Sequence, residues 1–208
     1  MSPAVRPAVR PRAMTILRRY AVPAVVFVWS DPVEQRRLAW YAAVARQLGE
    51  PEVERLKTVS YEEWRRVCER HALPAEDGDP CAPVSVVELA DLARIPGIEI
   101  GGHTDSHPIL ARVSTEEQRE EIVWNKSRLE AWTGRVVRAF AYPNGESATD
   151  YTPETMKLVE ESGFDFGFTT RPGFATPHEP ALAHSRFVML RGVSAGELGH
   201  RLAHSWRH

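Results

Sequence analysis

The stretch IEIGGHTDSHP (residues 98–108) places two histidines, His103 and His107, directly after a short apolar strand pattern. The two glycines before them allow close backbone approach, and Pro108 limits what can follow. If the chain makes one helical turn here, side chains four residues apart point the same way. Imidazole is the commonest metal ligand among protein side chains. The stretch therefore predicts a metal site, and the alternative is a pair of loop histidines without a ligand role.

The sequence on both sides of this stretch alternates strand-like and helix-like segments. Apolar runs predict strands at 22–28, 98–102, 136–143 and 164–170. A Ser three residues before a Glu predicts helix starts at Ser60, Ser85 and Ser114, and Thr152-Pro153 predicts another. Such alternation is typical of a parallel sheet or barrel with helices outside. In these folds chemistry collects at the C-terminal strand ends, where His103, Pro143 and Thr169 fall.

Composition limits the remaining possibilities. The 208 residues suit one domain, with 43% hydrophobic and 26% charged residues. A formal net charge of −2 gives no global field that would recruit nucleic acid or an anionic membrane. No apolar run reaches the roughly 18 residues of a membrane span, and the N-terminus does not resemble a signal peptide. Cys68 and Cys81 are too few for a disulfide framework, so we expect reduced thiols and, by default, a cytoplasmic protein.

A long segment, IEIGGHTDSHPILARVSTEEQREEIVWNKSRLEAWTGRVVRAFAYPNG, resembles the polysaccharide deacetylase family, also called the NodB-homology domain. That family has a His-(Ser/Thr)-x-x-x-His-type metal motif, then a helix, then a strand that ends in a proline-containing catalytic turn. The stretches ILRRYAVPAVVFV and ESGFDFGFTTRPG extend the resemblance from about residue 14 to 190. We expect a disordered tail at 1–12, the domain at 13–195 with an insertion at about 34–84, and a tail or helix at 196–208.

The resemblance implies an α/β fold, a deformed (β/α)7-type barrel, and metal-assisted removal of acetyl groups from a polysaccharide or glycan. His103 and His107 would bind the divalent metal, with zinc favoured over cobalt, nickel or manganese, and Thr104 would brace the turn between them. The catalytic turn would consist of Tyr142, Pro143 and Asn144, with a backbone N–H near Asn144 in the oxyanion pocket. Tyr142 could also line a sugar groove, or its ring could simply pack at the barrel mouth.

One part of the family pattern is missing from this chain. The third metal ligand and the catalytic base are two adjacent aspartates in a Thr-Phe-Asp-Asp-Gly-type motif on the first strand, and no Asp precedes Asp31. At the family spacing the pair would fall near Pro3, which cannot belong to a central strand. We therefore expect a barrel without its first strand. Two imidazoles without a carboxylate bind metal weakly, and an attacking water would lack a proton acceptor.

Several interpretations remain open on the sequence alone. Asp31 or Asp105 could stand in as a metal ligand, although Asp105 should point away from the histidines. The chain could be a hydrolase with a mis-called start or a truncated gene, a non-catalytic carbohydrate-binding protein, or a fragment without stable function. Arg186 is expected in a structural ion pair. Five tryptophans are expected to pack in the core or between helices, namely Trp29, Trp40, Trp64, Trp124 and Trp132.

Overall fold

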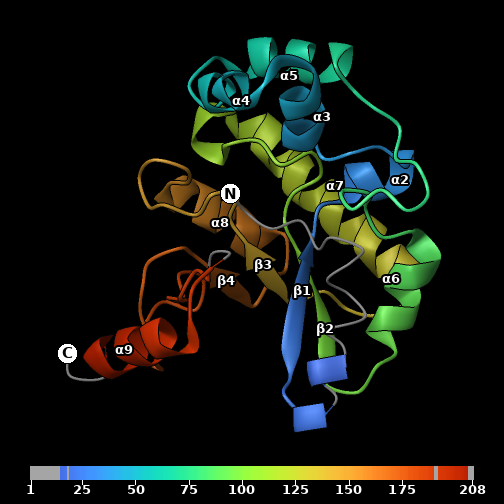
Figure 1. The fold of residues 1–208 in the computed structure, drawn as a ribbon. Helices are drawn as coiled ribbons and strands as arrows, with labels where there is room; N and C mark the ends of the chain where they lie inside the picture. The colour runs from blue at the N-terminus through green and yellow to red at the C-terminus, as the bar shows by residue number, and fades with distance from the viewer. Residues whose placement is uncertain (1–14, 18, 190–191, 206–208) are drawn as a thin grey trace.

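A computed structural model describes residues 15–17, 19–189 and 192–205, and its described strands form one parallel sheet in the order β1-β2-β3-β4 (Figure 1). The strands are β1 (Ala24–Val28), β2 (Ile98–Gly102), β3 (Ala139–Ala141) and β4 (Phe166–Phe168). Val28 pairs with Gly102, and Gly102 with Phe140, so the strand ends are aligned. The α/β class predicted from the sequence is confirmed. The tail and the absent first strand expected at the N-terminus lie outside the described residues.

The helices start where local capping chemistry favours them. They are α2 (Ser30–Gln35), α3 (Trp40–Leu48), α4 (Glu50–Leu56), α5 (Tyr61–Arg70), α6 (Val86–Ala93), η1 (Leu110–Arg112), α7 (Thr115–Thr133), α8 (Pro153–Glu161) and α9 (Ala195–Ser205). Capping boxes open α6, α7 and α8, as the sequence predicts for the first two. The box expected at Ser60 is incomplete, because the Glu63 carboxylate accepts instead from Arg55. No described helix is both long and apolar enough to cross a bilayer.

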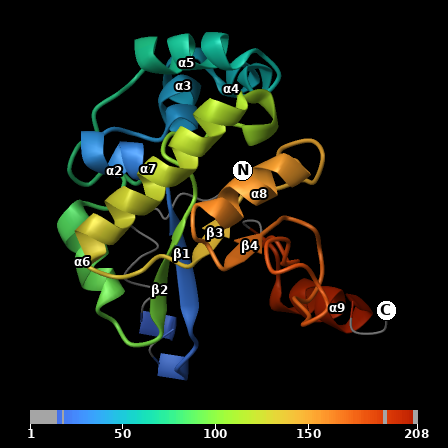
Figure 2. The same ribbon diagram turned by 180° about the vertical axis from the view of Figure 1, so that it is seen from behind.

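Three helices cover one face of the sheet. Figure 2 shows α7 lying across β1 and β2 with α6 and α8 on either side of it. Their apolar faces share a buried core with the strands, which includes Leu89, Ile122, Leu129, Phe140 and Val159. Strand β1 is less buried than expected, since Val25 is 36% exposed and the described sheet pairs β1 with β2 alone. Strand β3 is also shorter than the expected 136–143.

The segment expected as an insertion folds into helices beyond the C-terminal ends of β1 and β2. Figure 1 shows α3, α4 and α5 gathered at the top of the molecule, at the end of the sheet toward which β1 runs. These helices have a core of their own, formed by Val44, Val53, Leu56 and Trp64. They therefore lie on the edge of the sheet where the sequence predicts the site.

A substitution at Gly102, the last residue of β2, would test how tightly the C-terminal edge of the sheet is packed. A Cβ there would lie 2.7 Å from Oδ1 of Asn125 and 2.9 Å from Cζ of Phe164. We expect Gly102→Ala to lower the free energy of unfolding by about 1–3 kcal/mol in urea titration, as overpacked cores do. Gly199→Ala in α9 is the control, because nothing lies within 4 Å of that position. Equal stability of the two variants would contradict the tight packing described here.

Candidate functional site

His103 is the first residue after β2, at the C-terminal edge of the sheet. Its backbone N–H donates to Oδ1 of Asn125 at 3.0 Å, and its ring Nδ1 lies 2.6 Å from the carbonyl oxygen of Ala141. A carbonyl oxygen only accepts, so the proton is assigned to Nδ1 and the ring lone pair to Nε2. A backbone carbonyl on one ring nitrogen is the arrangement that orients metal-binding histidines.

The turn between the two histidines is not helical, so that prediction is wrong. Thr104 and His107 both adopt left-handed backbone conformations, with φ of 65° and 68°. The Thr104 hydroxyl donates to the His103 carbonyl at 2.6 Å and accepts from the His107 N–H at 3.1 Å, so it braces the turn. The two rings nevertheless meet, with centroids 4.7 Å apart and planes at 82°.

Burial keeps both imidazoles neutral. Each residue is only 6% exposed. Loss of solvation lowers the pKa of His103 to about 4, and the charge of Arg186 acts in the same direction. Burial and the neighbouring His103 hold the pKa of His107 well below its ordinary value. The buried Nε2 of His107 has no hydrogen-bond partner within the described residues. A neutral imidazole with an unpartnered nitrogen is the form that binds a metal.

No carboxylate completes this pair. Asp31 is held by Arg37, whose Nη2 lies 2.6 Å from it. Asp105 accepts from the Ser30 hydroxyl at 2.5 Å and pairs with Arg128. The described residues contain no group of three His, Cys, Asp or Glu side chains placed to hold a metal, and the remaining positions of the chain include no Asp or Glu. The donor set thus fits two imidazole ligands but not the three protein ligands of a catalytic zinc.

The expected catalytic turn divides into buried and accessible parts. The Tyr142 ring is fully buried, stacks on Tyr151 with centroids 4.1 Å apart, and donates its hydroxyl to the Leu182 carbonyl at 2.9 Å. It therefore packs in the core and does not line a sugar groove. Pro143 is also buried, and its carbonyl accepts from the N–H of the second residue after it at 2.6 Å. Asn144, with φ of 56°, is the member of the turn that shares a cavity with His107.

The cavity beside His107 and Asn144 is small, and the insertion covers it. Its volume is about 20 Å³, close to what one water molecule needs. The segment from α3 to α5 supplies half of its lining residues, which are Trp40, Leu56, Lys57, Val59, Tyr61 and Trp64. Behind the histidine, the Trp29 ring lies 4.7 Å from the His107 ring. In this conformation the insertion covers the histidine pair.

Two buried polar residues of α7 that we did not single out from the sequence hold the site together. Asn125 donates to the Val28 carbonyl at 2.9 Å and to the Ser30 hydroxyl at 3.1 Å while it accepts from His103. Glu121 accepts from the backbone N–H groups of Asp105 and Ser106 at 2.9 Å and 2.8 Å. Both belong to the buried face of α7, so polar residues at core-facing helical spacing were the available signal.

Arg186 also differs from expectation. Its Nε donates to the Thr169 carbonyl at 2.7 Å, and its guanidinium lies 5.8 Å from the centroid of the Phe27 ring. No ion pair with a described carboxylate accompanies these contacts, so the predicted structural ion pair is wrong. Burial lowers the pKa of Arg186, and its charge lies close enough to lower that of His103.

The pKa of Glu121 predicts a pH dependence of stability. Burial raises this pKa from 4.5 to about 7, and hydrogen bonds from Ser106 only partly oppose the shift. Because the folded state keeps the proton to higher pH than the unfolded chain, wild-type stability falls as pH rises from about 4.5 to about 7. Glu121→Gln removes this loss, so the variant should gain about 1–3 kcal/mol relative to wild type across that range in urea titrations. A stability difference that does not change with pH would contradict the raised pKa.

Known proteins resemble this chain in sequence and in fold. The family model for polysaccharide deacetylase matches residues 3–167 of the chain. YxkH of Bacillus subtilis strain 168, whose name places it among the polysaccharide deacetylases, is 29% identical over 103 residues. That match covers 50% of this chain and 36% of YxkH, so the chain matches only about a third of the length of this relative.

Solved structures share the fold. A de-N-acetylase from Aggregatibacter actinomycetemcomitans aligns with a TM-score of 0.63 and 13% identity, over 95% of this chain and 71% of that one. The Streptococcus pyogenes deacetylase PplD, solved with acetate, aligns with a TM-score of 0.53 and 16% identity, over 87% of this chain and 97% of that one. Identities this low support the fold alone. The family model, however, spans well over half of the sequence, and the chain belongs to the polysaccharide deacetylase family.

Proposed function

We propose that this chain is a carbohydrate-directed member of the deacetylase family that binds a divalent metal through His103 and His107 and does not hydrolyse acetyl groups by itself. The observation that carries this proposal is the contrast within the site. Two neutral imidazoles meet at a ring separation of 4.7 Å, while the two nearby aspartates are bound to arginines and a serine. The site therefore has two imidazole ligands for a metal, but the described residues supply no free carboxylate that could act as a third ligand or as a base.

The residues of this chain would each support a bound acetyl group in a defined way. A divalent cation at the imidazole pair would polarise the acetyl carbonyl and make a bound water more acidic. His103 is oriented for binding by the Ala141 carbonyl. The backbone N–H of Asn144 is the proposed donor to the carbonyl oxygen, since Asn144 borders the same cavity as His107. Imidazole nitrogen favours zinc and also suits cobalt, nickel or manganese.

Hydrolysis needs a proton acceptor that these residues do not supply. A general base works best when its pKa lies near the working pH. The pKa of His103 is about 4 and that of His107 is also depressed, so both rings are weak bases. Asp31 and Asp105 are already bound to cationic partners. The α3–α5 segment also lines the cavity beside His107, which has room for about one water molecule and not for a sugar unit.

A second candidate is a metal-dependent glycan deacetylase whose carboxylate comes from a segment or subunit beyond these residues. The observation in its favour is that this chain matches only 36% of the length of YxkH, so this relative has further segments that the match does not include. The two candidates share the metal ligands and the substrate class. They differ in whether acetate is released.

Metal binding tests the part that both candidates share. Calorimetric titration with zinc or cobalt should show one site per chain, and His103→Ala/His107→Ala should weaken binding at least tenfold because both donors are removed. The control is His178→Ala, which removes an exposed histidine far along the chain from the pair. Unchanged metal uptake in the double variant would exclude these two ligands.

Acetate release separates the two candidates. With excess zinc and an N-acetylglucosamine oligomer, we expect the wild-type chain to release acetate no faster than His103→Ala/His107→Ala, because no base is available. Acetate would be quantified by a coupled enzymatic assay or by proton NMR. Release that depends on the histidines would overturn the non-hydrolytic proposal and favour the second candidate.

A further inference from the structure

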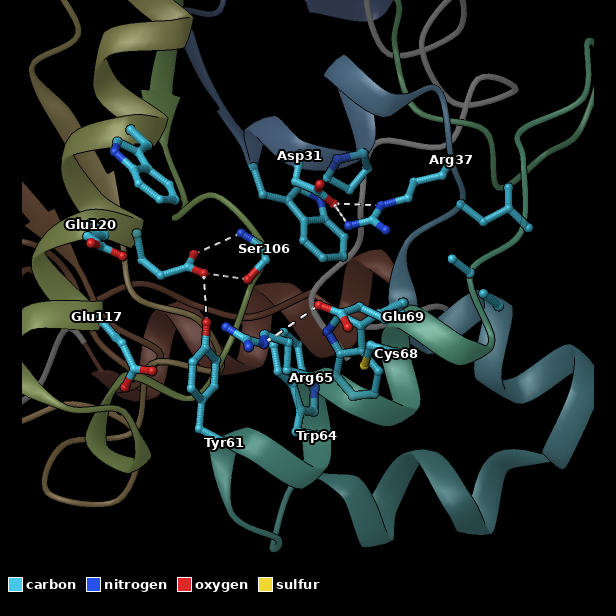
Figure 3. A pocket seen from close by; sticks show the side chains of 18 residues that line it. Asp31, Arg37, Tyr61, Trp64, Arg65, Cys68, Glu69, Ser106, Glu117 and Glu120 are labelled. Carbon is cyan, nitrogen blue, oxygen red and sulfur yellow. Dashed lines mark hydrogen bonds and ion pairs between the residues drawn. The ribbon is translucent and has the colours of Figure 1, made fainter.

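A larger cavity, separate from the one beside the histidines, lies between the insertion and α7. Its volume is about 270 Å³, and Figure 3 shows α5, α7 and the loop after β2 around it. Trp40, Tyr61 and Trp64 form a wall common to this cavity and the small one beside His107. The large cavity therefore lies next to the candidate site and combines residues of the insertion with residues of α7.

Aromatic side chains make up much of its lining. They are Trp29, Trp40, Tyr61, Trp64 and Trp124. Trp29 and Trp64 are buried, as the sequence predicts, but Trp124 is 51% exposed. Trp124 extends from α7 at the boundary of the cavity and does not pack in a core. An exposed indole beside a lined cavity offers an apolar face to a ligand.

The charges in this cavity are unbalanced. Its two cations are already paired, Arg37 with Asp31 at 2.6 Å and Arg65 with Glu69 at 3.6 Å. Two further carboxylates, those of Glu117 and Glu120, come from α7 at helical spacing that places them on one side of the helix. Neither forms an ion pair with any described residue. Figure 3 shows Glu117 and Glu120 on the side of the cavity opposite Arg37.

We propose that this cavity binds a single amino-sugar unit that carries a free ammonium group. The CH faces of a pyranose ring pack on aromatic side chains, and the ammonium group pairs with the α7 carboxylates. The volume lies just below the usual range for ligand pockets, which fits one sugar ring and not an oligomer. This ligand class rests on the proposed carbohydrate-directed function, but it requires neither a metal nor hydrolysis at the histidine pair.

The same features argue against the neighbouring ligand classes. An N-acetylated sugar is neutral, so it would desolvate the α7 carboxylates without supplying a counter-charge. A quaternary ammonium group such as that of choline has the charge but no N–H donor, so its cationic centre supplies no hydrogen bond to the carboxylate oxygens. An ammonium-bearing sugar supplies the charge, the donors and the apolar face together.

The cavity is also connected to the histidine loop. Glu121 accepts from the Ser106 hydroxyl at 2.5 Å and lies 3.4 Å from the Tyr61 hydroxyl, as the dashed lines in Figure 3 show. Ser106 directly precedes His107 in the chain. A ligand on Glu117 and Glu120 would therefore lie beside Glu121, the residue that is hydrogen-bonded to the loop carrying the candidate metal ligands.

The test is a binding comparison at fixed ionic strength. Glucosamine, N-acetylglucosamine and choline would each be titrated while tryptophan fluorescence and calorimetry are followed. We expect saturable binding of glucosamine, at least tenfold tighter than binding of either other compound. Tighter binding of choline, equal binding of N-acetylglucosamine, or no saturable glucosamine binding would each overturn the proposal.

Variants locate the site and separate this proposal from the preceding one. Glu117→Gln/Glu120→Gln should weaken glucosamine binding at least tenfold, and it preserves the capping box because Gln also serves at that position. Glu99→Gln/Glu160→Gln removes the same charge from exposed positions outside the cavity and should bind glucosamine as wild type does. The His103→Ala/His107→Ala variant should still bind glucosamine while it loses metal. Wild-type affinity in the Glu117→Gln/Glu120→Gln variant would overturn the assignment.

Discussion

The side-chain amide of Asn125 is the interaction on which the geometry of this edge depends. It is fully buried on α7, donates to the Val28 carbonyl and the Ser30 hydroxyl, and accepts from the His103 N–H. One side chain therefore fixes the end of β1, the end of β2 and the helix that covers them. Any apolar replacement would leave buried backbone groups without partners, which costs more than the bonds themselves contribute. Gly102 has no side chain at the point where the amide and the Phe164 ring approach.

Burial of the two imidazoles favours metal binding but opposes proton transfer. It keeps the imidazoles of His103 and His107 neutral, which favours metal binding. The same burial makes both rings weak bases, and the cavity between His107 and the α3–α5 segment leaves room for about one water molecule. A site prepared in this way holds a cation more readily than it promotes proton transfer. The fold is that of the deacetylases, but function depends on the groups present at the site.

The segment at about 34–84 shapes both cavities at the candidate site. It covers His107 on the side of the small cavity, and with α7 it forms a second cavity lined by aromatic and carboxylate side chains. Its helices have their own small core, so their position does not depend on the sheet alone. The acidic side of that cavity comes from α7, whose neighbouring buried face packs on the sheet core. One helix thus joins the histidine loop, the core and the insertion.

The sequence by itself determined the features that arise from near neighbours. The capping boxes at Ser85 and Ser114 and the strand before His103 depend on residues a few positions apart, and such spacing can be read directly. Tertiary structure decided what depends on partners far along the chain. These include the pairing of Asp105 with Arg128, the burial of the Tyr142 ring, whose hydroxyl donates to the Leu182 carbonyl, and the exposure of Trp124. No local pattern specifies them, because each depends on segments that are distant in the sequence and meet only when the helices and loops pack on the sheet.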